Sequence, residues 1–183
     1  GDHSFSALAG FVASRYVGES ANSSIRGFSD NKIHSMNAGT VLNKPSEDYG
    51  ASTNASVLGR VTYDYQNKYL ATVNFRADGS SKFGVNNRWG YFPSFSLGWR
   101  LTGEEFMKPL DWLSDLKLRV GWGQVGNDQV GYYSSYGIYG IGANYNMDGI
   151  ILPGYYQSQI GNDKLRWERT TQTNVGLDFS FLN

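Results

Sequence analysis

Three consecutive stretches of alternating apolar and polar residues lie between Val57 and Arg100, and they constrain the fold more than any other feature. In the stretch that ends at Arg100, for example, Phe95, Leu97 and Trp99 alternate with small or polar residues. Because a strand points successive side chains to opposite faces, each stretch predicts a strand with one apolar and one polar face. Such strands fit a soluble sandwich, whose apolar face covers a core, or a membrane barrel, whose apolar face contacts lipid.

The composition excludes several classes of protein. Of the 183 residues, 17% are charged, 15% are aromatic and 40% are hydrophobic, whereas disordered chains are rich in charge and poor in aromatic residues. These values favour an all-β domain with aromatic strands. The formal net charge is zero and no basic block is present, so we expect no nucleic-acid partner.

The absences in the sequence exclude further classes of site. There is no cysteine, so disulfides, thiolate nucleophiles and zinc-thiolate sites are excluded. No run of about 18 apolar residues predicts a membrane helix, although a membrane strand needs only about 10 alternating residues. The chain opens at Gly1-Asp2-His3 without a signal-peptide pattern, and we expect it to be a segment of a longer protein.

Six long strands are predicted, most of them longer than the about 5 to 6 residues of an ordinary strand. Their connections alternate between long and short, as in outer-membrane barrels, which have long outer loops and tight inner turns. The predicted strands are residues 3–13, 55–65, 69–76, 91–101, 116–123 and 165–181. The predicted outer loops are residues 14–54, 77–90 and 124–164, and the inner turns are residues 66–68 and 102–115.

No catalytic, cofactor or metal site is predicted. Glu104 and Glu105 are adjacent carboxylates whose side chains diverge; they follow Thr102 at the start of a predicted helical turn and are expected to cap it. Residues 78–81 (Asp-Gly-Ser-Ser) predict a turn and lack the remaining ligands of a calcium loop. His3 and His34 are far apart and unsupported by other metal ligands. No nucleophile elbow or phosphate-binding loop is present.

An ordered series of short motifs goes beyond periodicity. It comprises Asp-Gly-Ser-Ser-Lys-Phe-Gly (78–84), Arg-Trp-Gly-Tyr-Phe-Pro-Ser-Phe-Ser-Leu-Gly-Trp-Arg (88–100), Leu-Lys-Leu-Arg-Val-Gly (116–121), Gly-Asn (126–127) and Leu-Arg-Trp-Glu (165–168). With residues 60–70 and 105–107, this series resembles the barrel of the SusC/RagA-like TonB-linked outer-membrane transporters. The resemblance covers nearly the whole chain.

The resemblance implies a fold, a location and partners. Members of that family carry a plug inside a barrel of about 22 strands and import glycans, oligosaccharides or peptides with energy from the TonB complex. A SusD-like surface lipoprotein lids the barrel. We therefore expect residues 1–183 to be a partial antiparallel transmembrane β-barrel domain in the outer membrane of a Gram-negative bacterium, in contact with lipid. The plug, the signal peptide, the remaining strands and the N-terminal part that meets TonB are absent from the sequence. The alternative is a soluble β-sandwich module for carbohydrate binding or adhesion.

Two sets of candidate functional residues follow. Aromatic side chains in a polar loop can stack on sugars or bind a partner, or can simply pack the loop against itself; these are Tyr132, Tyr133, Tyr136, Tyr139, Tyr145, Tyr155 and Tyr156. Charged residues on the polar strand faces are expected to face the barrel lumen and to meet the plug, the substrate or structural carboxylates; these are Arg60, Asp64, Arg76, Arg100 and Arg119. Aromatic residues near strand ends are expected to form interfacial girdles; these are Tyr63, Tyr65, Tyr69, Trp99, Trp122 and Phe179.

Overall fold

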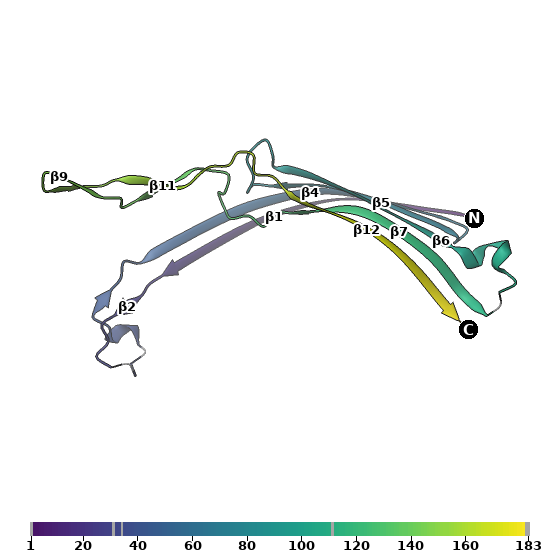
Figure 1. Ribbon diagram of the computed structural model, residues 1–183, viewed down its shortest axis with the longest axis horizontal. Coiled ribbons are helices and arrows are strands. Elements are labelled where there is room, and N and C mark those ends of the chain that lie inside the picture. Colours follow the sequence, from purple (N-terminus) through teal and green to yellow (C-terminus); the bar gives the residue numbers. More distant parts are fainter. Residues whose placement is uncertain (1, 31, 34, 111, 182–183) are drawn as a thin grey trace. The chain divides into compact units, whose positions relative to one another are not determined.

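The structure is a computed structural model that describes residues 2–30, 32–33, 35–110 and 112–181. It comprises two units, one formed by residues 1–14 and 53–183 and the other by residues 15–52. Six long strands form one sheet in the order β1-β4-β5-β6-β7-β12, and the four pairs from β4 to β12 are antiparallel. The strands are β1 His3–Asn22, β4 Ser46–Tyr65, β5 Tyr69–Ser80, β6 Trp89–Arg100, β7 Leu113–Asn127 and β12 Glu168–Phe181 (Figure 1).

The pairing register divides the sheet into a polar and an apolar face. Thr72 on β5 lies opposite Thr62 on β4 and Ser96 on β6, whereas the next residue, Val73, lies opposite Val61 and Phe95. Residues that pair directly across antiparallel strands share a face, so the alternation seen in the single strands adds up across the sheet.

The apolar face is uncovered in the part of the chain that the structure describes. The side chains of Val73, Leu97 and Val175 are 56%, 54% and 73% exposed, although each lies in the middle of its strand. A soluble β-sandwich would cover these residues with a second sheet. Among the described residues no second sheet covers this face, so the structure disfavours the alternative of a soluble sandwich module. Among the described residues, no helix has the length and apolar character needed to cross a membrane.

The long strands extend further than the sequence pattern predicted. The predicted loop 14–54 is wrong at both ends, because β1 continues to Asn22 and β4 begins at Ser46. The predicted loop 77–90 is likewise shortened, since β5 reaches Ser80 and β6 begins at Trp89. Residues 78–80 are therefore strand and not a turn, with Asp78 paired to Gly90. Because polar residues occupy both faces of these extensions, the hydrophobic alternation stops there, although the pairing between strands continues.

The unit of residues 15–52 contains, besides the ends of β1 and β4, a small hairpin. Strand β2 (Ile25–Arg26) pairs with β3 (Val41–Leu42), and a single 3-10 turn, η1 (Met36–Ala38), lies between them in sequence. The Thr40 hydroxyl donates to the Gly27 carbonyl at 3.0 Å and closes the hairpin. His34, one of the two histidines considered for metal binding, lies outside the described residues.

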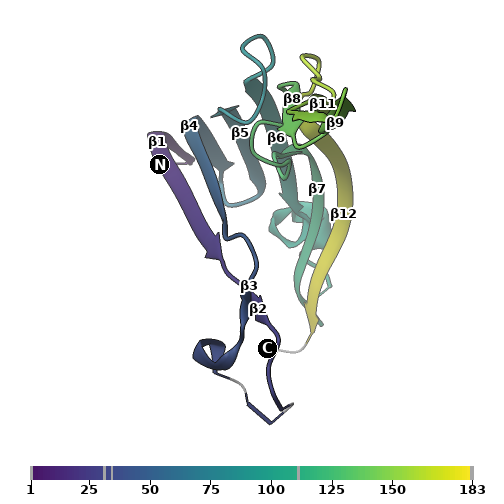
Figure 2. The same ribbon diagram turned by 90° about the vertical axis from the view of Figure 1, so that its left-hand side faces the viewer.

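The predicted loop 124–164 contains four short strands. Strand β8 (Ile138–Ile141) pairs with β11 (Tyr155–Gln159), and β9 (Tyr145–Met147) pairs with β10 (Ile150–Leu152). Figure 2 shows β8, β9 and β11 gathered beyond one end of β7 and β12. Strand β7 runs on to Asn127, four residues past the predicted end, and β12 begins at Glu168, three residues after the predicted start.

An aromatic cluster closes the same end of the sheet. Phe83 is 1% exposed and Phe92 is 4% exposed, and the ring of Trp167 lies 5.3 Å from the first and 5.5 Å from the second. The Trp167 indole donates to the Arg88 carbonyl at 2.9 Å. Gly126 is required here, because a Cβ at this position would overlap the Phe92 ring. Four of the motifs that carry the family resemblance, at residues 78–84, 88–100, 126–127 and 165–168, thus meet in one packed cluster.

The opposite end of β6 and β7 carries two 3-10 turns, η2 (Leu101–Gly103) and η3 (Glu105–Met107) (Figure 1). The helical turn was predicted correctly, but the capping role of its acidic residues is wrong. No side chain caps either turn. The Thr102 hydroxyl instead lies 3.2 Å from the Asp115 carboxylate, and the Glu104 carboxylate accepts hydrogen bonds from neighbouring strands. A single turn leaves few free amides to cap, and partners across the sheet compete for the same oxygens.

Candidate functional site: the polar face of the sheet

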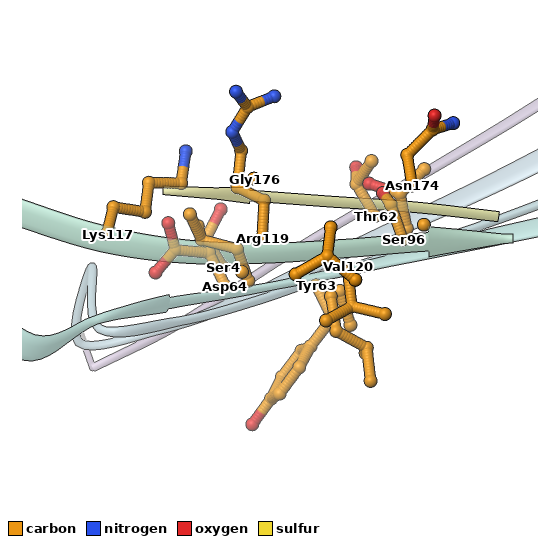
Figure 3. Close-up of a pocket in the computed structure, with 17 residues that line it drawn as sticks. Ser4, Thr62, Tyr63, Asp64, Ser96, Lys117, Arg119, Val120, Asn174 and Gly176 are labelled. Carbon is orange, nitrogen blue, oxygen red and sulfur yellow. The ribbon is translucent and has the colours of Figure 1, made fainter. Parts of the chain in front are cut away.

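An open groove of about 830 Å³ runs across the polar face from β1 to β12. Its floor is made of small residues on adjacent strands, among them Thr72, Ser96, Gly98, Gly121 and Gly176. Longer polar side chains stand above this floor, and Figure 3 shows Lys117, Arg119 and Asn174 projecting to one side of the sheet while Tyr63 projects to the other. The groove is hollow because glycine, serine and threonine leave the centre of this face unfilled.

Arg119 is held in a fixed position in this groove. It pairs with Gly98 on β6 and with Gly176 on β12, so no neighbouring side chain competes for the space above the strands. Its guanidinium lies over Gly176 and contacts Asp178 at two points, Nε to Oδ2 at 2.7 Å and Nη2 to Oδ1 at 2.8 Å. This two-point geometry is the strongest that an arginine and a carboxylate form.

Lys117 differs from Arg119 in having no ion-pair partner among the described residues. It pairs with Asp178 across the ladder, but that carboxylate is already bound to Arg119. The Lys117 ammonium therefore remains available to an acceptor in the groove.

A second groove, of about 570 Å³, adjoins the first on the same face. Arg60 Nε donates to Asn74 Oδ1 at 2.6 Å, and Asn74 Nδ2 donates to Ser94 Oγ at 3.1 Å, which links β4, β5 and β6. Arg76 forms an ion pair with Asp78, Nη2 to Oδ1, at 2.8 Å. Among the described residues, Arg60 has a neutral partner and no carboxylate.

Two of the predicted charged residues have local roles. Arg100 forms an ion pair with Asp115 at 3.2 Å and lines neither groove. Asp64 lines the first groove, but one of its oxygens accepts the amide of Asn67 at 2.8 Å and so braces the turn between β4 and β5. Asn67 has a φ of 53°, a left-handed conformation that asparagine tolerates better than most residues.

The predicted set omitted several neutral residues that line the two grooves: Thr62, Asn74, Ser94, Ser96, Gln172 and Asn174. Selection by charge alone passed over them. Apart from Gln172, which lies between two threonines, they stand next to apolar residues in the same strands, so strand periodicity was sufficient to place them on this face.

The candidate tyrosines differ in their contacts and in their exposure. Tyr132 lies beneath the Lys82 ammonium, 5.9 Å from its ring centre, and the Tyr156 ring packs against Gly140. Tyr139 and Tyr155 are 69% and 72% exposed and share one face of the β8–β11 ribbon. The others, Tyr133, Tyr136 and Tyr145, are between 43% and 57% exposed.

Aromatic side chains form two rows on the apolar face. One row stacks His3, Tyr65, Tyr69 and Trp99 in succession, with ring centres 4.7 to 6.5 Å apart. The other row is the stacked pair Phe75–Tyr91, and the stacked pair Phe95–Trp122 lies between the two rows. Along β6 the eight residues from Trp99 to Tyr91 span ~26 Å at about 3.3 Å per residue. This separation is comparable to the apolar band of an outer-membrane barrel, about 25 Å tall.

Glu104 ties the first aromatic row to the turn beside it. Its Oε1 accepts the Tyr69 hydroxyl at 2.6 Å and the Trp99 indole at 3.1 Å, and its Oε2 lies 3.5 Å from the Lys68 ammonium. The hydrogen bond from Tyr69, followed by that from Trp99, holds the pKa of the Glu104 carboxyl below its usual value of 4.5.

Acidification is expected to weaken this contact. Because the pKa of Glu104 is lower in the folded protein than in the unfolded chain, the stabilisation is complete above about pH 4.5 and is lost as the pH falls further. The thermal midpoint of the full-length protein in detergent should fall between pH 6 and pH 3, and the fall should be smaller in Glu104→Gln. Glu105→Gln is the matched comparison: it removes an exposed carboxylate whose pKa is lowered by Lys108 on the same turn, and it should reduce the fall less than Glu104→Gln does. An equal fall in wild type and Glu104→Gln would contradict this role.

Comparison with known proteins gives consistent matches. The family model described as TonB dependent receptor-like, beta-barrel, matches residues 2–183. The chain is 38% identical over 180 residues to the TonB-dependent receptor P39 of Formosa agariphila, a match that covers 97% of this chain and 17% of the relative. It is 43% identical over 136 residues to the TonB-dependent receptor SusC of Bacteroides thetaiotaomicron, covering 72% of this chain and 14% of SusC.

A solved structure shares the fold. The structure of the RagAB peptide transporter contains a chain that matches the whole of this one with a TM-score of 0.84 and 29% identity. The match covers 20% of that chain. The present chain thus spans a fifth or less of the length of these relatives.

Proposed function

Since the chain belongs to the TonB-dependent receptor β-barrel family, we propose that it is part of the barrel wall of an outer-membrane transporter that imports glycans, oligosaccharides or peptides. The plug, the remaining strands and the part that meets the TonB complex belong, on this proposal, to a longer protein. Residues 1–183 then form one partial barrel domain. The proposal includes no catalytic step, in keeping with a family of transporters.

The observation that carries this proposal is the division of the same six strands into an uncovered apolar face and a hollow polar face. In a barrel wall the first contacts lipid and the second faces the lumen, where water, plug and substrate meet it. A small-residue floor with hydroxyl, amide and guanidinium groups above it suits a ligand rich in hydrogen-bonding groups, such as an oligosaccharide or a peptide.

The lumen-facing charges then divide into two roles. Arg76, Arg100 and Arg119 are bound to carboxylates of the wall itself; the Arg76 pair lies within β5, and the other two join neighbouring strands. Lys117 and Arg60 lack carboxylate partners among the described residues, so they are the groups that we assign to contacts with the plug or with substrate. Charged groups inside a barrel are normally paired, because removal from water is costly without a partner.

The exposed ribbon of β8 and β11 is the surface that we assign to contact with a lid protein. Tyr139, Ile141 and Tyr155 share one face and are all more than two-thirds exposed, an arrangement suited to a protein partner. We assign to this ribbon the contact with a SusD-like surface lipoprotein. A photo-crosslinking amino acid at position 155 of the full-length protein should capture that lipoprotein, while one at Leu97 should not.

Labelling of single cysteines tests the orientation of the wall. Because this segment has no cysteine, Ser96→Cys and Leu97→Cys each introduce one thiol on adjacent residues of β6. A small charged thiol reagent added to the full-length protein in membranes should label position 96. It should leave position 97 unlabelled, since lipid covers that side. Equal labelling of both positions would show that the apolar face is exposed to water and would overturn the proposal.

Gene deletion tests the activity. A strain that lacks the full-length gene should lose uptake of fluorescent oligosaccharides or of fluorescent peptides, and a plasmid copy should restore it. Loss of the TonB complex should have the same effect. Unchanged uptake of both classes of compound would contradict the transport function, whereas loss of one class would identify the substrate.

A further inference from the structure

A polar hollow of about 450 Å³ lies apart from the two grooves of the polar face. It is lined by Asn86, Asn87, Trp89 and Gly90 on one side and by Arg166, Trp167 and Arg169 on the other. These residues come from the segment that precedes β6 and from the segment that enters β12. We call this site the arginine hollow.

The pairing register places two residues of the arginine hollow, Trp89 and Arg169, on the apolar side of their strands. Arg169 shares the side of β12 that carries Val175 and Leu177, since it is an even number of residues from both. Trp89 likewise shares the side of β6 that carries Tyr91 and Leu97, and its ring lies against Gly79, the residue with which it pairs.

The arginine hollow lies just beyond the second aromatic row. Trp89 is two residues, ~7 Å along the strand, past Tyr91 of that row. On β12 the apolar residues end at Val175 and are followed on the same side by Thr173, Thr171 and Arg169. If the aromatic rows mark the edges of the hydrocarbon layer, the hollow is at the level of the lipid headgroups.

The charges of the arginine hollow are uncompensated. In the ranges that the structure describes, neither Arg166 nor Arg169 has an ion-pair or side-chain hydrogen-bond partner. Asp163, three residues before Arg166, lies on the loop that Asn87 holds through the Asp163 carbonyl, at 2.9 Å. Glu168 is engaged by Asn127 at 3.0 Å and lies on the opposite face of β12.

We propose that the arginine hollow binds the phosphate group of an outer-leaflet lipid headgroup. Guanidinium groups recognise phosphate with paired hydrogen bonds, and tryptophan is favoured at the boundary between hydrocarbon and headgroups. A lipid is favoured over a soluble anion because Trp89 and Arg169 of the hollow share the strand sides that carry the apolar residues. The inference rests on the proposed orientation of the barrel wall but not on its substrate or lid.

Native mass spectrometry of the full-length transporter in detergent tests this site with bisphosphorylated lipid A as the probe. Each basic residue near an anionic lipid surface contributes about a fivefold increase in affinity. Arg166→Gln/Arg169→Gln should therefore bind lipid A about 25-fold more weakly than wild type. Arg166→Lys/Arg169→Lys, which keeps the charge but not the fork of donors, should lose less. Lys44→Gln/Lys164→Gln removes the same charge from residues outside the hollow and should bind normally.

Further measurements distinguish binding of a lipid phosphate from binding of soluble phosphate. Dephosphorylated lipid A should bind wild type as weakly as lipid A binds the double glutamine variant. Competition by millimolar inorganic phosphate alone would instead identify a site for a soluble anion and would overturn the assignment to lipid. Equal losses in the Arg166→Gln/Arg169→Gln and control variants would also overturn it. Substrate uptake, measured on the same variants, should be retained, so a failure here is separable from a failure of the transport proposal.

Discussion

Phe83→Ala is expected to loosen the segment between β5 and β6 more than any other single truncation in the chain. The Phe83 ring is 1% exposed and packs 5.3 Å from Trp167, so its removal leaves a cavity in the aromatic cluster. Truncation of a buried phenylalanine costs about 3–5 kcal/mol. This free-energy cost makes local opening easier, because the segment is joined to the residues before β12 mainly through this cluster and through the Asn87–Asp163 and Trp167–Arg88 hydrogen bonds.

Hydrogen exchange of the full-length protein measures this opening. The Ser80 amide, which donates to the Arg88 carbonyl at 3.0 Å, should exchange about two to three orders of magnitude faster in Phe83→Ala. Val85→Ala is the matched control, since Val85 belongs to the same segment but is 74% exposed. If both variants exchange at the same rate, the cluster does not hold the segment, and the cavity has been refilled by neighbouring side chains.

Val73→Arg is expected to disrupt insertion of the barrel into the membrane. Val73 lies on the apolar face midway between the two aromatic rows, paired with Val61 and Phe95. An arginine on the lipid face near the middle of the bilayer costs about 2–4 kcal/mol. Thr72→Arg adds the same side chain one residue away on the polar face, above the small residues of the larger groove, and should cost less than about 1 kcal/mol.

Full-length protein of each variant is refolded into lipid vesicles over a series of urea concentrations. The folded fraction is then measured from the electrophoretic mobility before and after heating. The midpoint should fall strongly for Val73→Arg and little for Thr72→Arg. The reverse order would mean that the polar face contacts lipid. Equal shifts would mean that lipid contacts neither face in the middle of the strand.

The fold class was predictable because the alternation of apolar and polar residues shows, for each residue, which face of a strand its side chain occupies. Residues 57–65, 69–76 and 91–100 alternate cleanly, and the structure confirms antiparallel strands there, within the barrel family that the motifs resembled. The strand ends were not predictable in the same way. Beyond the apolar band both faces are polar, so the extensions of β1, β4 and β7 leave no periodic pattern in the sequence.

The candidate site was predictable in part. The polar-face residues Arg60, Arg76 and Arg119 follow from strand period alone, but their partners depend on register. Asp178 is 59 residues from Arg119 in the chain, and only the pairing of β7 with β12 brings the two within 2.7 Å. The role of Glu104 was missed for the same reason, since Tyr69 and Trp99 reach it across strands.

The sequence by itself determined that this chain forms strands with one apolar and one polar face, because the two-residue period belongs to each strand alone. The tertiary structure decided which charges are paired and which remain free, and it brought residues 83, 92 and 167 into one cluster. It also placed Arg166 and Arg169 beside Trp89. These arrangements depend on the register between strands, which is set by contacts between segments distant in the chain and is therefore not a property of any one segment.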